Sequence, residues 1–141
     1  MSYVIVDASV SLKWALNDEE HGAQAVALRD AAVREHRFEM LAPSLWVYEV
    51  TNGLIVAVRR GRIDGATGER ALRLLLALGV RLVDPAPVDV YREAGRYGIA
   101  AYDAAYLALA RALDAPLWTG DGRFYQAVKE DPLVRWIGDF A

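Results

Sequence analysis

The chain of 141 residues contains no cysteine. This absence excludes disulfide bonds, thiolate metal sites and a cysteine nucleophile, and it fits a reducing compartment. Histidine is nearly absent as well: the sequence has only His21 and His36, which lie in or beside a polar-faced segment and are predicted on the surface. No glycine-rich loop followed by lysine is present, which argues against a P-loop nucleotide enzyme.

Long apolar runs and targeting signals are also missing. No window approaches the run of about 18 uncharged apolar residues that a membrane-spanning helix needs. The first residues lack a basic segment, and Asp7 interrupts their short apolar run, so a signal peptide is not indicated. We therefore expect a soluble, cytoplasmic protein without a membrane partner.

Net charge is small, at −3. Bulk charge thus gives no reason to expect nucleic-acid binding, and any such contact would need a local basic patch. The hydrophobic share is 55% and the charged share 25%, which is typical of a globular chain. The length predicts one domain, residues 1–141, with a substantial core.

Short apolar runs alternate with longer helical patterns along the sequence. Strands are predicted at 3–7, 38–42, 80–83, 116–119 and 134–137. Helices are predicted at 10–16, 19–35, 45–60, 64–78, 88–97, 102–113 and 124–129, with Gly61, Gly79 and Gly98 at three of their ends. In the second helix, Ala23, Val26, Ala27, Ala31 and Ala32 are expected on one side. This alternation predicts an α/β fold with a central parallel sheet covered by helices on both faces.

Four acids stand where apolar residues are expected. Asp7 ends the apolar run V-I-V, and Asp121 follows the predicted strand L-W-T. Glu49 and Asp103 lie in helices that are otherwise nearly free of charge. Ligands of parallel α/β folds bind beyond the carboxyl ends of the strands, so the four side chains could meet at one edge of the sheet. The other acids, including Glu93 and Asp131, are predicted on solvated faces.

Each of these acids except Glu49 also has a structural explanation. Asp7 and Asp103 could cap the helices that follow them, and Asp121 could belong to a G-D-G turn. Taken together, four crowded carboxylates repel one another unless a cation neutralises them. Magnesium or manganese suits such oxygen ligands and can activate water beside a phosphate.

Four segments resemble motifs of the PIN-domain family, in particular the small VapC-type toxins of toxin–antitoxin pairs. They are V-I-V-D-A-S-V, A-P-S-L-W-V-Y-E-V-T-N, Y-G-I-A-A-Y-D-A-A-Y-L-A-L-A and L-W-T-G-D-G-R-F, in the family's order. The resemblance implies a three-layer α/β/α sandwich around a parallel sheet of about five strands. It also implies an endoribonuclease dependent on Mg²⁺ or Mn²⁺.

The resemblance assigns roles to particular residues. Asp7, Glu49, Asp103 and Asp121 match the acidic quartet, with Asp7 and Asp103 as direct metal ligands and the other two acting through water or a second ion. Ser9, Asn52 and Thr119 match the supporting polar positions. Gly122 departs from many relatives, which carry a longer polar residue there, and it is expected to loosen the turn of Asp121.

The implied partners are an RNA substrate, a cognate VapB-like antitoxin and a second copy of the chain. Candidates for RNA contact are Lys13, Arg96 and Arg123, with Trp14, Tyr102 and Trp118 as aromatic candidates, although Trp118 also fits the core. The leucines between 72 and 78 suit either the core or a dimer surface.

Three alternatives remain open from the sequence. A solitary RNA-processing PIN nuclease and a non-catalytic PIN-like binding or scaffold module share the same motifs. Phosphoryl transfer through an aspartyl intermediate is disfavoured, because Ser9 replaces the second acid of the D-x-D motif that such enzymes use.

Overall fold

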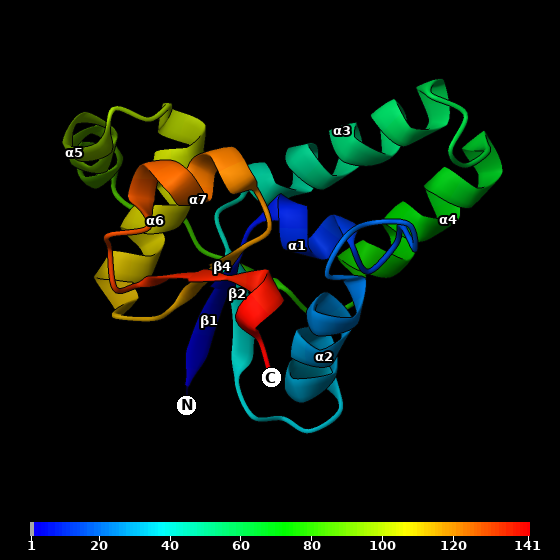
Figure 1. Cartoon of the computed structure of the whole chain (residues 1–141), viewed down its shortest axis with the longest axis horizontal. Coiled ribbons are helices and arrows are strands. Elements are labelled where there is room, and N and C mark those ends of the chain that lie inside the picture. The colour runs from blue at the N-terminus through cyan, green and yellow to red at the C-terminus, as the bar shows by residue number, and fades with distance from the viewer. Residues whose placement is uncertain (1) are drawn as a thin grey trace.

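The computed structural model describes residues 2–141 and contains every predicted helix and strand (Figure 1). The strands are β1 (Tyr3–Val6), β2 (Glu39–Ala42), β3 (Arg81–Leu82), β4 (Leu117–Thr119) and β5 (Val134–Trp136). The helices are α1 (Ala8–Leu12), α2 (Gly22–Val33), α3 (Leu45–Arg59), α4 (Gly65–Leu76), α5 (Pro87–Tyr97), α6 (Ala101–Leu113) and α7 (Gly122–Val128), with a short 3₁₀ turn η1 (Ile137–Asp139) at the end. The three predicted helix-ending glycines, Gly61, Gly79 and Gly98, all have positive φ.

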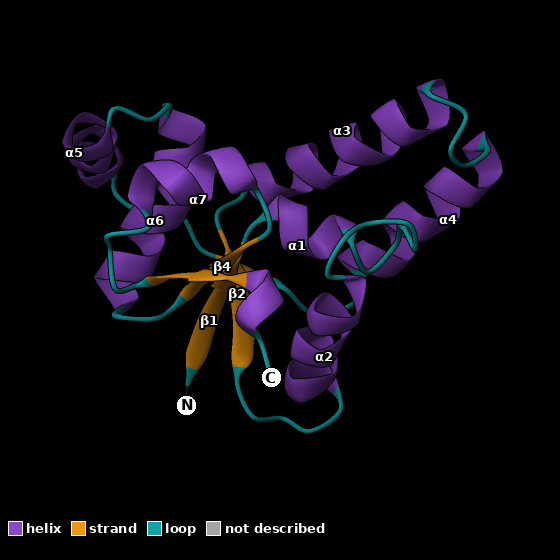
Figure 2. Ribbon diagram, in the orientation of Figure 1, coloured by secondary structure: helices purple, strands orange, loops and turns teal. Residues whose placement is uncertain are grey.

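The five strands form one parallel sheet in the order β3-β2-β1-β4-β5. Ile5 of the central strand β1 pairs with Leu41 on one side and Leu117 on the other, and its side chain is fully buried. Figure 2 shows the strands enclosed by helices, with α5 and α6 on one side of the sheet and α2 on the other. The predicted three-layer α/β/α arrangement is therefore confirmed, and burial on both faces explains why the strands read as continuous apolar runs.

Helix α1 differs most from its prediction. It spans Ala8–Leu12 rather than residues 10–16 and begins directly after Asp7, whose side chain accepts a hydrogen bond from the Val10 N–H at 3.2 Å. Asp7 is thus the N-cap of α1 and not the last residue of the strand. The predicted strand is one residue too long because capping ends it.

Helix α2 buries a different face from the one predicted. Ala25, Leu28, Ala31 and Ala32 are buried, whereas Ala23 and Ala27 are exposed. Alanine occurs on several sides of this helix, so the sequence pattern alone does not select the buried face. The larger Leu28 side chain marks the face that packs into the core.

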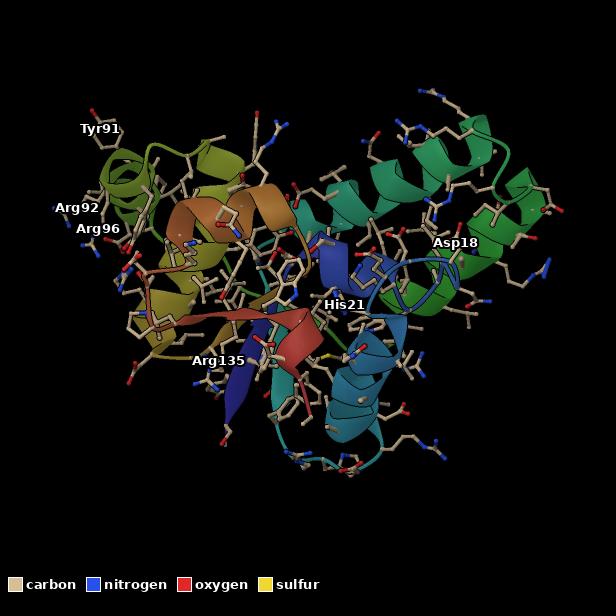
Figure 3. All side chains as sticks on the ribbon, in the orientation of Figure 1. Asp18, His21, Tyr91, Arg92, Arg96 and Arg135 are labelled. Atoms are coloured by element: carbon tan, nitrogen blue, oxygen red, sulfur yellow. The ribbon has the colours of Figure 1, made fainter. Side chains whose placement is uncertain are left out.

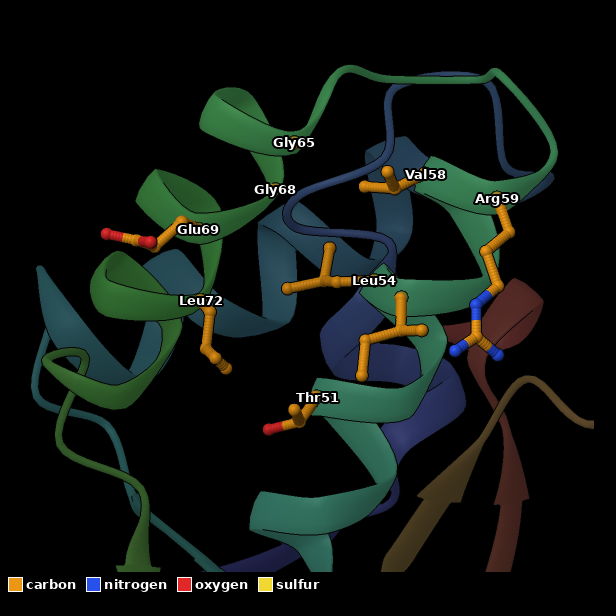
Figure 4. A pocket seen from close by; sticks show the side chains of 9 residues that line it. Thr51, Leu54, Val58, Arg59, Gly65, Gly68, Glu69 and Leu72 are labelled. Atoms are coloured by element: carbon orange, nitrogen blue, oxygen red, sulfur yellow. The ribbon is translucent and has the colours of Figure 1, made fainter.

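Helices α3 and α4 extend side by side away from the sheet (Figure 1). An apolar pocket of about 310 Å³ lies between them, with Leu54 and Val58 of α3 facing Gly68 and Leu72 of α4 (Figure 4). Of the predicted leucine cluster, Leu75 is buried, Leu72 and Leu78 are partly buried, and Leu74 and Leu76 are exposed. Within residues 2–141, no helix combines the length and apolarity needed to cross a membrane.

A charge network with two buried carboxylates joins α5, α6 and the segment after α7. Arg111 donates hydrogen bonds to both Glu93 and Asp131, and the Tyr97 hydroxyl donates to Asp131 at 2.6 Å. The prediction that Glu93 and Asp131 are solvated was wrong, because they are only 4% and 3% exposed. Although burial alone would raise the pKa of Asp131, the hydrogen bonds from Tyr97 and Arg111 hold it below the ordinary value.

Candidate functional site

An acidic pocket lies beyond the carboxyl end of β1, between α3, α6 and the start of α7. Its volume is about 590 Å³. Six of the seven predicted metal-binding and supporting residues line it: Asp7, Glu49, Asp103, Asp121, Ser9 and Asn52. The seventh, Thr119, is fully buried, and its hydroxyl oxygen accepts a hydrogen bond from the Asp121 N–H at 3.1 Å. The fold therefore brings the predicted acids together at one edge of the sheet.

Asp7 is the most buried of the four acids, with 7% of its surface exposed. The Ser9 hydroxyl donates a hydrogen bond to its carboxylate, and Ser9 in turn accepts one from the Gly120 N–H at 2.8 Å. These bonds connect the end of β1 to the loop after β4. Burial raises the pKa of Asp7 to about 6, and the negative charge of Asp121 adds a smaller increase.

Asp121 is the N-cap of α7. Its carboxylate accepts hydrogen bonds from the backbone N–H groups of Arg123 and Phe124, at 3.0 and 3.2 Å. The expected loosening at Gly122 is not observed, because Gly122 is the first residue of the helix and these two bonds hold the turn.

Glu49 reaches the pocket because α3 packs closely against α1. A Cβ on Gly53 would lie 2.3 Å from Leu12 Cδ1, so any larger residue would force the Leu12 side chain to shift. The Tyr106 hydroxyl donates a hydrogen bond to the Glu49 carboxylate at 2.6 Å. Burial raises the pKa of Glu49, and the charges of Asp103 and Asp121 add to the shift.

Tyr106 was missed as a site residue in the sequence. It is 2% exposed and lines the acidic pocket beside the acid that it orients. Its position three residues after Asp103 in a predicted helix places both on one side of α6, and that spacing was the available signal.

Asp103 has no structural role of the kind that the other acids have. The N-cap of α6 is Ala100, so the capping explanation for Asp103 was wrong. Its carboxylate forms no side-chain hydrogen bond within residues 2–141, and it lies in the first turn of α6, where the helix dipole favours negative charge. Partial burial raises its pKa, and the nearby charge of Asp121 contributes.

The residues that line this pocket, all in the described part of the chain, include no lysine, arginine or histidine. The basic candidates Lys13, Arg96 and Arg123 are not among them. Lys13 is only 8% exposed and packs against Gly120, whereas Arg96 lies 3.9 Å from Glu93 on α5. Any RNA contact made by these three side chains would fall outside the pocket.

Two of the aromatic candidates are core residues. Trp14 is 9% exposed and its indole N–H donates to the Ala25 carbonyl at 2.8 Å, and Trp118 is 8% exposed. The expectation that Trp14 could stack on a base was therefore wrong, while the core placement of Trp118 is confirmed. Tyr102 lines the pocket and is 70% exposed.

The donor set suits a hard divalent cation. All the charged groups of the pocket are carboxylates, and burial raises the pKa values of Asp7, Glu49 and Asp103, with smaller increases from the neighbouring negative charges. Within residues 2–141, no three Asp, Glu, His or Cys side chains converge closely enough to form a metal cluster. Magnesium is usually held by one or two carboxylates and several waters, so its binding does not require three converging side chains.

The buried carboxylate of Asp7 should make the stability of the metal-free protein depend on pH. The folded pKa of Asp7, about 6, exceeds the ordinary 3.8. Its contribution to the free energy of unfolding is therefore fully present below about pH 4 and is lost as the pH rises through about 6. Glu49 and Asp103 act in the same direction. Asp7→Asn keeps an oxygen that can cap α1 but does not titrate.

This pH effect is measured as the difference in free energy of unfolding between wild type and Asp7→Asn. In EDTA, the free energy of unfolding of Asp7→Asn, measured with urea, should rise relative to that of wild type between about pH 4 and about pH 7. The rise should reach up to about 1.4 kcal/mol for each unit by which the folded pKa of Asp7 exceeds its ordinary value. A difference that stays constant over this range would contradict the assignment.

Comparison with known proteins identifies relatives over most of the chain. The PIN domain family matches residues 4–130. "VapC ribonuclease Mb0985" from Mycobacterium bovis is 35% identical over 120 residues, which are 85% of this chain and 87% of that protein. "Exonuclease VapC9" from Pyrobaculum aerophilum is 34% identical over 87 residues, which are 62% of this chain and 65% of that protein.

A solved structure matches the fold as well. PAE2754 from Pyrobaculum aerophilum superimposes with a TM-score of 0.71 at 26% identity, covering 96% of this chain and 91% of that one. The same architecture thus extends over nearly the whole of both chains.

Proposed function

Because this chain belongs to the PIN-domain family, and within it to the VapC-type ribonucleases, we propose that its acidic pocket hydrolyses RNA internally, with Mg²⁺ or Mn²⁺. One observation carries this proposal: four carboxylates from separate elements line one pocket that contains no basic side chain. Such a pocket repels a phosphodiester unless a cation is present, and the same cation is what the hydrolysis needs.

The proposed roles follow from how each carboxylate is held. Asp7 and Asp103 would hold the cation directly, and Glu49 and Asp121 through water or a second ion. Ser9 orients Asp7, Tyr106 orients Glu49, and the first N–H groups of α7 orient Asp121. When bound, the divalent cation makes water a nucleophile near neutral pH and neutralises the charge that develops on the phosphate.

The supporting polar residues keep these carboxylates in place. Ser9 and Thr119 hold the loop after β4 by accepting hydrogen bonds from the Gly120 and Asp121 N–H groups. Asn52 lies one helical turn beyond Glu49 on the same face of α3, where its amide can bind water in the cation's shell. Fixed orientation of this kind avoids reorganisation during the reaction.

The proposed partners are a VapB-like antitoxin and a second copy of the chain. Kinship with VapC-type toxins supports the antitoxin. Exposed apolar side chains on α3 and α4, including Ile55, Leu74 and Leu76, offer surface for a protein partner. A solitary nuclease would share the acidic pocket but would have no antitoxin.

The function is tested with circular and linear single-stranded RNA of the same random-sequence pool, in Mg²⁺ or Mn²⁺, with EDTA as the blank. We expect the circles to be cut, because an internal cut needs no chain end. Cleavage of linear RNA alone would instead indicate an exonuclease, the activity in the name of the Pyrobaculum aerophilum relative. Equal cleavage in EDTA would overturn the metal-dependent mechanism.

Metal binding gives a second readout that does not depend on the RNA. A ligand that binds only the folded state stabilises it by RT ln(1 + [L]/Kd), about 1.4 kcal/mol at roughly ten times Kd. The unfolding temperature of wild type should therefore rise with Mn²⁺ concentration, and the unfolding temperature of Asp103→Asn should rise less. A non-catalytic scaffold would show no such difference.

A further inference from the structure

Two tyrosines at the acidic pocket are unusually exposed. Tyr48 on α3 is 77% exposed and Tyr102 on α6 is 70% exposed, and both line the pocket. Each directly precedes one of the helix-borne acids, Glu49 and Asp103. Their positions therefore place one aromatic ring on each of two elements that border the site.

Tyr48 and Tyr102 differ from Tyr97 and Tyr106 in their contacts with the described residues. The hydroxyls of Tyr97 and Tyr106 donate hydrogen bonds to buried carboxylates. By contrast, Tyr48 and Tyr102 form no side-chain hydrogen bond or aromatic pair within residues 2–141. Their rings remain available for a ligand that enters the pocket.

The charge of the pocket limits how that ligand can be held. RNA is a polyanion, and most proteins bind it through lysine and arginine. The lining of this pocket has four carboxylates and no basic side chain, so ionic contacts there oppose binding except through the cation. Stacking of bases on aromatic rings does not depend on charge and tolerates every base.

On the basis of the function proposed above, we propose that Tyr48 and Tyr102 are stacking residues for two bases that flank the phosphate in the acidic pocket. Stacking on a side chain requires a base face that its neighbours in the RNA do not cover, so these bases must be unpaired. The tyrosines would supply binding that the carboxylates cannot, on either side of the bond to be cut.

The test is steady-state cleavage of short single-stranded RNA by tyrosine variants in Mn²⁺. Tyr48→Ala and Tyr102→Ala should each raise KM about 10-fold and leave kcat near the wild-type value, because stacking stabilises substrate and transition state alike. Tyr48→Phe and Tyr102→Phe should keep the wild-type KM, because the ring is retained. Both positions are exposed, so the variants should fold, which thermal unfolding verifies.

Tyr91 provides a matched control. It is 81% exposed on α5 and points away from the molecule (Figure 3), and it does not line the acidic pocket. Tyr91→Ala should therefore leave KM and kcat unchanged. An equal rise of KM in this variant would show that the effect is unspecific and would overturn the proposal.

Abasic nucleotides identify the partner of each ring. Once the cut in one substrate is mapped, removal of the base beside it should raise KM for wild type but not for the tyrosine variant that has already lost the stack. Additive effects of base removal and the tyrosine change would contradict a direct contact.

The remaining outcomes separate this proposal from the proposed function. If wild type cuts RNA and both alanine variants retain its KM, the stacking proposal is wrong and the nuclease assignment stands. A changed oligomeric state or antitoxin affinity with unchanged KM would assign the tyrosines to a protein contact instead. If wild type does not cut RNA, binding of labelled single-stranded RNA still tests the tyrosines, and unaltered affinity of the alanine variants refutes their role.

Discussion

Asp103→Asn should abolish RNA cleavage without destabilising the protein. We expect a loss of at least about 1000-fold in kcat, or about 4 kcal/mol in activation free energy, because a carboxylate that holds the divalent cation is replaced by a neutral amide. The fold should be unaffected, because Asp103 caps no helix and its pKa is already raised by partial burial and by the charge of Asp121. In EDTA the variant should unfold at the same temperature as wild type or slightly higher.

The control for this prediction is Asp114→Asn. Asp114 is the exposed C-cap residue at the other end of the same helix, with φ of 48°, a left-handed conformation that asparagine also adopts readily. It lies outside the acidic pocket, so this variant should retain wild-type cleavage. Cleavage by Asp103→Asn at more than about a tenth of the wild-type rate would remove Asp103 from the mechanism.

Arg111→Ala should cost about 3–5 kcal/mol in free energy of unfolding, which is a large part of the 5–15 kcal/mol of a typical domain. The arginine is the shared partner of Glu93 and Asp131, whose side chains are only 5% and 2% exposed. Its removal leaves the buried Asp131 carboxylate without a cation, and it leaves Glu93 with only the surface Arg96 at 3.9 Å. Urea unfolding at neutral pH measures the loss.

Arg92→Ala on α5 is the matched control for the charge network. Arg92 is 73% exposed and pairs with Asp89 at 3.6 Å on the surface, where such pairs contribute little (Figure 3). This variant should remain within about 0.5 kcal/mol of wild type. The loss in free energy of unfolding caused by Arg111→Ala should be smaller in a protein that also carries Glu93→Gln and Asp131→Asn, because fewer unpaired charges remain buried. An undiminished deficit would point to lost packing of the arginine side chain instead.

The order of the helices and strands could be predicted from the sequence because the local apolar pattern of each segment agrees with its place in the fold. Runs such as Val4–Ile5–Val6 are apolar throughout since both faces of the parallel sheet are covered. The four acids could be identified because they depart from this pattern: a carboxylate is not expected at the end of a buried strand or in an apolar helix. A functional site is where such violations are expected.

What escaped prediction depends on contacts between distant residues. Arg111 meets Glu93 and Asp131 across 18 and 20 residues of sequence, so each charge read alone resembled a solvated one. The same holds for Tyr106 and Glu49, which are 57 residues apart. The prediction of the buried face of α2 was wrong for another reason. Alanine carries too little apolar area for its position to indicate which side of the helix packs into the core.

The double role of the strand-end aspartates has an evolutionary consequence. Asp7 and Asp121 cap α1 and α7, whereas the side chain of Asp103 forms no hydrogen bond within residues 2–141. Selection for folding alone would therefore preserve a capping side chain at positions 7 and 121 after selection for cleavage had ceased, with asparagine accepted at position 7, and mutations would accumulate first at position 103. In a descendant that had lost its activity, residues able to cap a helix would remain at positions 7 and 121, and the residue at position 103 would be the more informative record of whether the enzyme still works.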